Sequence, residues 1–225
     1  MKKHLVTLML LCTITISTQT TITKNIGDFT TLKVYNGISL ELIKSDVQQL
    51  VITGEKAEKV TIKNVRNILK VALKFPETLA KNKVSVVLYY NNKIDIIDAN
   101  EGSSITAKEF KQQILEVRAQ EGALINMVVE VKHLTVKSIS GSVIKLTGTA
   151  KNQVVEAGNA GVYHGFNIKI SNSSIVRASL GGKAEIFTGE TLDAKVSFGG
   201  SIFYKGNPEL LKTKKVLGGI IEEKN

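Results

Sequence analysis

The sequence predicts an all-β protein whose chain winds into a right-handed parallel β-solenoid with about 20 residues per coil. Three observations predict this fold. Glycine recurs at a near-constant spacing, alternating apolar and polar residues flank each recurrence, and no long run with the 3.6-residue period of a helix follows residue 100. The 225 residues are 43% hydrophobic but only 5% aromatic, so the core must consist mainly of Ile, Val and Leu.

The glycine repeat is clearest when one glycine is taken from each copy. Successive members lie 20, 19, 20, 21, 18 and 19 residues apart, and the set is Gly102, Gly122, Gly141, Gly161, Gly182, Gly200 and Gly219. Because glycine adopts positive φ without a steric cost, we expect these residues to form the corners between strands. A coil of this length is too short for a strand–helix–strand unit, and right-handed winding follows the general preference of crossover connections.

Short alternating segments precede and follow the corners. "ILEVRA" and "LTVKSI" are examples before a glycine, and "SVIK" and "SIFY" are examples after one. This alternation predicts half-buried strands in which every second side chain faces the core. In "SIFYKG" we expect Phe203 to face the core and Tyr204 to be exposed or to have a capping role.

The N-terminus is typical of an exported protein. Residues 1–19 have a basic start, Lys2 and Lys3, followed by a short apolar run, which predicts a secretory signal peptide. Cys12 is the only cysteine and lies in this segment, so the mature chain would have neither disulfides nor thiol chemistry. We therefore expect a periplasmic, cell-surface or extracellular location, with no transmembrane segment.

The mature chain, residues 20–225, is expected to form one domain. Residues 20–92 contain less regular strands that would cap the solenoid, and residues 93–225 form the regular coils. Only "PETLAKNK", residues 76–83, has helical leanings. The net charge is +10, but the lysines are scattered among apolar residues, which favours a solvated face over a nucleic-acid site.

Several segments resemble a known family. "FTTLKVYNGISLELIKSD" (29–46) resembles the opening of the head GIN domain of putative autotransporter adhesins, and "GGSIFYKGNPEL" (199–210) resembles its closing element. Within that element, Tyr204-x-Gly206-x-Pro208 is the most specific part. The resemblance implies a secreted or envelope protein with a right-handed parallel β-helix and a role in adhesion, and it brings no catalytic residues.

The sequence contains no convincing catalytic or cofactor-binding constellation. His133 and His164 are expected to be lone surface histidines, because a metal site needs several ligands in register. Asp95, Asp98 and Glu101 precede the first corner and are the best candidates for Ca²⁺ binding or for acid–base chemistry, but they match no metal-binding motif. We therefore expect no metal, no cofactor and no enzymatic activity.

The preferred functional hypothesis is an exported, non-enzymatic surface protein or binding module that recognises a glycan or a protein. Candidate ligand-binding residues are Tyr89, Tyr90 and Tyr204, because exposed aromatic rings form sugar-binding platforms. One alternative is a polysaccharide-active enzyme, a lyase or hydrolase, on the same scaffold. Another is an envelope scaffold or sensor module without a ligand of its own.

Overall fold

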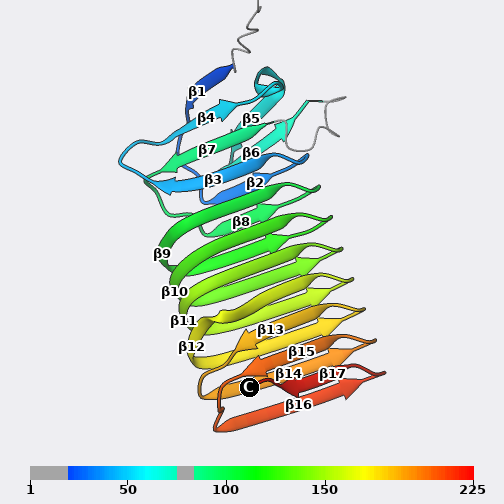
Figure 1. Cartoon of the computed structure of the whole chain (residues 1–225). Helices are drawn as coiled ribbons and strands as arrows, with labels where there is room; N and C mark the ends of the chain where they lie inside the picture. The colour runs from blue at the N-terminus through cyan, green and yellow to red at the C-terminus, as the bar shows by residue number, and fades with distance from the viewer. Residues whose placement is uncertain (1–19, 75–83) are drawn as a thin grey trace, which may run out of the picture.

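A computed structural model of the protein describes residues 20–74 and 84–225, and nearly all of its regular structure is β-strand (Figure 1). The first strands are β1 (Thr21–Asn25), β2 (Thr31–Val34), β3 (Ser39–Lys44), β4 (Gln49–Thr53), β5 (Val60–Val65), β6 (Ile68–Leu73) and β7 (Ser85–Tyr90), with a short 3₁₀ helix at Ala57–Lys59. The following strands are β8 (Ile96–Ala99), β9 (Ser104–Ala119), β10 (Leu124–Ile139), β11 (Val143–Gly158), β12 (Val162–Ser179), β13 (Lys183–Phe187), β14 (Thr191–Ser197), β15 (Ser201–Lys205), β16 (Leu210–Val216) and β17 (Ile220–Glu223).

The chain forms a β-solenoid of about seven turns of roughly 19 residues, which confirms the predicted fold class. Each of these solenoid turns, called coils below, contributes one strand to each of two walls. Wall A contains β7, β3, the first halves of β9 to β12, β13, β15 and β17, all paired in parallel. Wall B contains β6, β2, β8, the second halves of β9 to β12, β14 and β16, also parallel.

Eight connections from wall B to wall A are tight turns, which lie on the right-hand side of Figure 1. Two successive residues in each turn have φ between 47° and 82°, as in a type I′ β-turn. The eight pairs are Asn36–Gly37, Glu101–Gly102, Glu121–Gly122, Ser140–Gly141, Asn159–Ala160, Leu180–Gly181, Phe198–Gly199 and Leu217–Gly218. Backbone hydrogen bonds also join neighbouring turns, such as Gly122 N to Ser140 O at 3.1 Å.

The glycines of the sequence repeat lie in these turns but perform two different tasks. Gly102, Gly122 and Gly141 have positive φ, as expected for corner residues. Gly161, Gly182 and Gly200 instead follow the positive-φ pair; a Cβ atom there would lie 2.0, 2.2 and 2.3 Å from a carbonyl oxygen of the preceding coil. These three positions therefore exclude a side chain because the coils approach closely. The positive φ belongs to the residue before each of them.

The N-terminal strands form a cap with a different topology. The coil made by β2 and β3 lies inside the stack, between β6 and β7 on one side and β8 and β9 on the other. Antiparallel pairing of β4 with β1 and β7, and of β5 with β6, closes this end. The predicted signal peptide with Cys12, and residues 76–83 with their helical leanings, lie outside the described residues.

The inward positions of the two walls form ladders of aliphatic side chains, such as Ile105, Ile125 and Ile144 in successive coils. One expected orientation was wrong. In β15, Ile202 and Tyr204 face inward, and Tyr204 is only 7% exposed. Phe203 therefore faces outward, where Lys183 and Lys224 lie 5.4 and 5.0 Å from its ring centre.

Within the described residues, no antiparallel strand covers the C-terminal end of the stack. Leu211 and Ile221 continue the apolar ladders of Leu192 and Ile202 into the last coil, but other inward positions there are polar. In wall B, Thr213 and Lys215 of β16 continue the buried ladder of Ala194 and Val196. In wall A, Glu223 of β17 follows the buried Tyr204. Charged residues at inward positions of an edge coil oppose the stacking of another sheet, because stacking would bury them.

The two glycine tasks can be separated by substitutions at adjacent residues of one turn. Gly182→Ala should lower the free energy of unfolding by about 1–3 kcal/mol, because its Cβ meets the backbone of Ala157. Gly181→Asn should cost less than about 1 kcal/mol, since asparagine tolerates positive φ and no atom lies within 4 Å of the new Cβ. Denaturant unfolding measures both values, and equal costs would contradict the close-approach explanation.

The polar end of the core should control self-association. The double variant Lys215→Val/Glu223→Val makes the end coil apolar on its inward face, so we expect concentration-dependent dimers or longer end-to-end assemblies. Lys214→Val/Glu222→Val removes the same charges from outward positions and serves as the matched control. Sedimentation velocity of both variants checks the prediction, which fails if they associate to the same extent.

Candidate functional site

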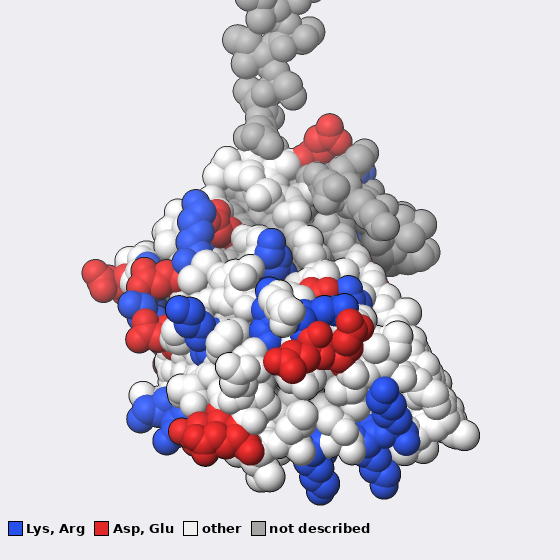
Figure 2. Space-filling view, turned by 60° about the horizontal axis from the view of Figure 1, so that its bottom comes forward, with Lys and Arg blue, Asp and Glu red and all other residues white. Residues whose placement is uncertain are grey.

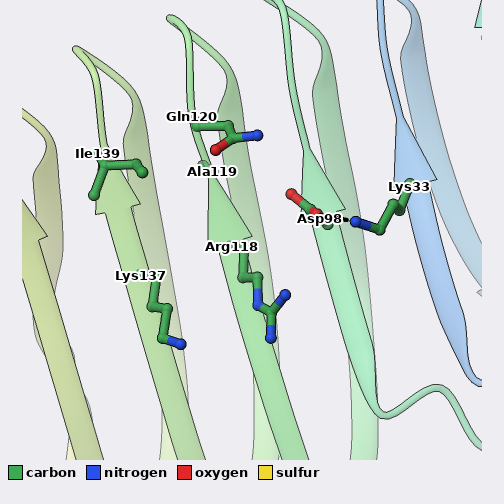
Figure 3. A pocket seen from close by; sticks show the side chains of 7 residues that line it. All are labelled: Lys33, Asp98, Arg118, Ala119, Gln120, Lys137 and Ile139. Carbon is green, nitrogen blue, oxygen red and sulfur yellow. Dashed lines mark ion pairs between the residues drawn. The ribbon is translucent and has the colours of Figure 1, made fainter.

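A pocket of about 310 Å³ opens on the outer face of wall B, close to the turns (Figure 3). Four charged side chains line it from four neighbouring strands. The parallel register aligns Lys33 of β2 with Asp98 of β8, Asp98 with Arg118 of β9, and Arg118 with Lys137 of β10. Gln120, Ala119 and Ile139 complete the lining. The pocket thus follows from four equivalent outward positions in successive layers.

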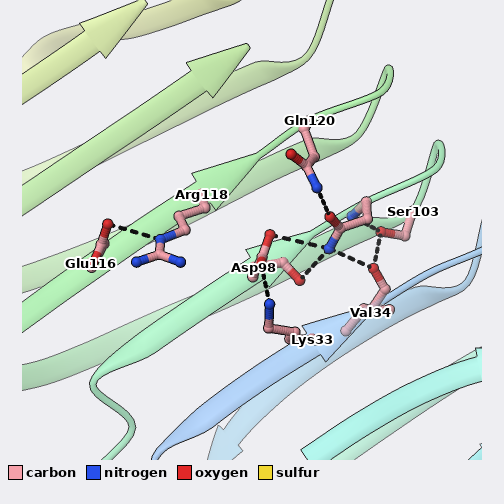
Figure 4. Close-up of polar contacts among 8 residues, drawn as sticks. Lys33, Val34, Asp98, Ser103, Glu116, Arg118 and Gln120 are labelled. Carbon is pink, nitrogen blue, oxygen red and sulfur yellow. Dashed lines mark hydrogen bonds and ion pairs between the residues drawn. The ribbon is translucent and has the colours of Figure 1, made fainter. Parts of the chain in front are cut away.

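Asp98 is the most buried charged group of the pocket, with 5% of its surface exposed. Lys33 Nζ lies 3.2 Å from its Oδ2, and Asn100 Nδ2 donates to its Oδ1 at 3.1 Å. Gln120 Nε2 in turn donates to Asn100 Oδ1, and the Asn100 backbone N–H donates to Ser103 Oγ at 3.0 Å (Figure 4). Both carboxylate oxygens therefore have a donor, Lys33 from the neighbouring strand β2 and Asn100 from the end of the same strand.

A second ion-paired group lies beside the pocket on β9. Arg118 Nε donates to Glu116 Oε1 at 2.8 Å, and Lys137 Nζ lies 3.1 Å from the same oxygen. The hydrogen bond from Arg118 lowers the pKa of the Glu116 carboxyl, partial burial opposes it, and Lys137 lowers the pKa further. The same contact raises the pKa of the Arg118 guanidinium. Both partners are therefore held in their charged forms.

The pocket presents donors and acceptors side by side without a large excess charge. Each of its cations is within ion-pair distance of a carboxylate: Lys33 of Asp98, and Arg118 and Lys137 of Glu116. Ile139 adds one apolar side chain at the rim. Such a site is suited to a ligand with hydroxyl or amide groups that both donate and accept hydrogen bonds.

The structure separates the three carboxylates singled out in the sequence. Asp98 lines the pocket, Asp95 pairs with Lys93 at 2.6 Å, and Glu101 accepts a hydrogen bond from Asn36. Within residues 20–74 and 84–225, no group of three or more histidine, cysteine, aspartate or glutamate side chains is placed to hold a metal ion.

Sequence analysis missed the other pocket residues, although a signal was present. Asp98, Arg118 and Lys137 each lie four residues before a repeat glycine, namely Gly102, Gly122 and Gly141. Charged side chains at one position of successive repeats lie next to each other on one outer face.

The two histidines expected to be alone on the surface each contact one polar neighbour. His164 Nδ1 lies 2.6 Å from Glu185 Oε2, and His133 Nδ1 lies 3.3 Å from Asn152 Nδ2.

The three candidate tyrosines do not form one platform. Tyr90 is 4% exposed, stacks on Phe110 with ring centres 5.8 Å apart, and has a pKa that burial raises to about 12. Tyr204 is also buried, several strands away along wall A, whereas Tyr89 is half-buried on β7. Their contact with a ligand stays a prediction, which for Tyr90 and Tyr204 would require their rings to become accessible.

Solved structures with the same fold come from Bacteroides and Parabacteroides species. A putative adhesin from Bacteroides fragilis superposes with a TM-score of 0.81 at 18% identity, covering 92% of this chain and 98% of that one. A putative adhesin from Parabacteroides merdae (18% identity) and a putative lipid binding protein from Parabacteroides distasonis (15%) both give a TM-score of 0.67, each covering 93% of this chain and 98% of its own.

No curated protein matches the sequence. No helix within the described residues has the length and hydropathy needed to cross a bilayer. The profile of the family described as putative auto-transporter adhesin, head GIN domain, matches residues 28–208, from three residues before β2 to two residues before β16. The chain therefore belongs to the head GIN domain family, as its sequence motifs predicted.

Proposed function

We propose that this protein is an exported, non-enzymatic surface module that binds a polar ligand, a glycan, in the pocket on wall B. The observation that carries this proposal is the pocket itself, in which Lys33, Asp98, Arg118 and Gln120 present donors and acceptors on a rigid sheet. Sugar hydroxyls both donate and accept hydrogen bonds, so they match this arrangement better than a purely anionic ligand. The adhesin descriptions of the family and of the similar structures support a binding role.

The ionisation of the carboxylates supports binding rather than catalysis. Enzymes that cleave glycosidic bonds with two carboxyl groups need one as an acid, with a pKa raised towards neutrality. Hydrogen bonding from Arg118 instead lowers the pKa of Glu116. Asp98 is paired with Lys33 and accepts a hydrogen bond from Asn100, so both of its oxygens already have partners within the protein.

Substitutions in the pocket should weaken saccharide binding without unfolding the protein. We expect Gln120→Ala and Asp98→Asn each to raise the Kd for a saccharide selected from a glycan array by about tenfold or more. Gln120→Ala removes a hydrogen-bonding group from the pocket, and Asp98→Asn replaces a charged acceptor oxygen by a donor. Glu185→Gln is the matched control, since this carboxylate is also ion-paired but lies on wall A. Isothermal titration calorimetry measures all three, with circular dichroism to verify folding.

Unchanged affinity in both pocket variants would overturn the proposed site. Turnover of an acidic polysaccharide by the protein, abolished in Asp98→Ala, would overturn the non-enzymatic assignment and restore the lyase or hydrolase alternative.

The ion pairs of Glu116 should give a pH-dependent contribution to stability. Its lowered pKa means that the stabilisation is present above the unfolded-state pKa, near 4.5, and disappears as the pH falls through the folded-state pKa. Glu116→Gln should therefore lower the free energy of unfolding by about 0.5–1 kcal/mol at pH 7, given the partial exposure of both cations, and by less below pH 4.5. Urea unfolding from pH 7 to pH 3 tests this, with the exposed Glu130→Gln as the control.

A further inference from the structure

Three bulky apolar side chains project from equivalent turns in the last three coils. Leu180, Phe198 and Leu217 are 53%, 54% and 72% exposed. The residues directly before them are neighbours across the strands of wall B, where Ser179 pairs with Ser197 and Ser197 pairs with Val216. The three side chains therefore form one ridge along the edge of the stack, roughly 10 Å long at the usual strand spacing. We call it the apolar ridge.

The backbone conformation makes these residues unusual. Each takes the first left-handed position of its turn, with φ of 49°, 48° and 54°. Bulky side chains are rare in this region because Cβ crowds the following carbonyl, whereas asparagine is readily accepted. The other five turns have Asn36, Glu101, Glu121, Ser140 and Asn159 at this position. The turn itself therefore does not require an apolar residue, and the ridge needs another explanation.

A row of basic side chains accompanies the ridge. Arg177, Lys195 and Lys214 each lie three residues before a ridge residue, in "RASLGG", "KVSFGG" and "KKVLGG". They are direct cross-strand neighbours on the outer face of wall B. Like charges in such positions repel each other. Arg177 Nη1 lies 2.9 Å from Asp193 Oδ1, but Lys195 and Lys214 make no ion pair within the described parts of the chain.

These two features together match an anionic lipid surface. We infer that the apolar ridge inserts between lipid headgroups while Lys195 and Lys214 contact lipid phosphates. Apolar side chains flanked by lysine or arginine are the general pattern of proteins that lie in the membrane interface. The three ridge residues do not line the pocket of wall B, so this contact is a second site, independent of the proposed saccharide site. Figure 2 shows charged groups separated by broad uncharged surface on the C-terminal side.

Replacement of the ridge by asparagine tests the inference with little risk of unfolding. Leu180→Asn/Phe198→Asn/Leu217→Asn places at each turn a residue that its φ favours, so stability should be equal or higher. In co-sedimentation with vesicles of phosphatidylcholine and phosphatidylglycerol, partitioning of the full chain should fall by at least about tenfold.

Val47→Thr/Val65→Thr/Ile114→Thr is the matched control, since it removes three side chains of similar exposure elsewhere and should leave partitioning unchanged. The basic variant Lys195→Gln/Lys214→Gln should lose about tenfold of its binding to the anionic vesicles and retain its weaker binding to pure phosphatidylcholine.

A direct readout is available because the chain contains no tryptophan. Phe198→Trp should give a blue-shifted emission on the anionic vesicles and quenching by brominated lipids. Failure of the unaltered chain to bind these vesicles would overturn the inference, as would equal binding by the ridge and control variants. Self-association of the unaltered chain that is lost in the ridge variant would identify a second copy as the occupant and would also overturn it. Asp98→Asn should retain vesicle binding, which separates this result from a failure of the saccharide site.

Discussion

The structure depends on parallel, in-register hydrogen bonding between equivalent strands of successive coils. This pairing satisfies the backbone and simultaneously places every residue beside its counterpart in the next coil. Inward positions become aliphatic ladders, and outward positions become rows. The pocket of wall B is one such row, from Lys33 to Lys137, and the apolar ridge is another. A surface site in this fold is therefore formed by one residue from each of several successive coils.

The outward row of the pocket changes character along the stack. Near the N-terminal cap the signs alternate, with Lys33 beside Asp98 and Asp98 beside Arg118, so cross-strand attraction contributes to stability. Towards the C-terminal end the same row becomes Arg177, Lys195 and Lys214, and attraction gives way to repulsion. Within the described residues, Arg177 still has an ion-pair partner in Asp193, whereas Lys195 and Lys214 at the C-terminal end of the row have none.

Much of the regular solenoid could be predicted from the sequence, because its contacts recur at a fixed separation. Period and strand alternation are local signals, and both identified the coils. The orientation of Phe203 and Tyr204 was mispredicted. The alternating pattern shows that every second side chain faces the core, but when both residues are aromatic it does not show which of them does so. The sequence does not show which repeat glycines have positive φ and which, like Gly161, Gly182 and Gly200, lie against the neighbouring coil, because close approach to that coil leaves no mark within the turn itself.

The N-terminal cap and the pocket were harder to predict for different reasons. The cap brings together strands that are distant in the sequence, such as β2 and β8, so no period reveals their pairing. The pocket depends on the repeat, and its charged residues could have been found by comparing the same position across coils. Lys33 is the exception. Its strand, β2, is separated in the sequence from its neighbour β8 by the whole β3–β7 segment, so the repeat period does not connect Lys33 with Asp98.

The position of the β2–β3 coil inside the stack has a consequence for the order of folding. During synthesis this coil emerges first, but the layer that covers one of its sides, β8 and β9, follows only after the whole β4–β7 segment. The later coils need only a partner about one coil away, so their loop-closure entropy is smaller. The regular coils can thus form first, while the N-terminal strands still lack their partners. We expect completion of the N-terminal cap to be the late, slow step of folding.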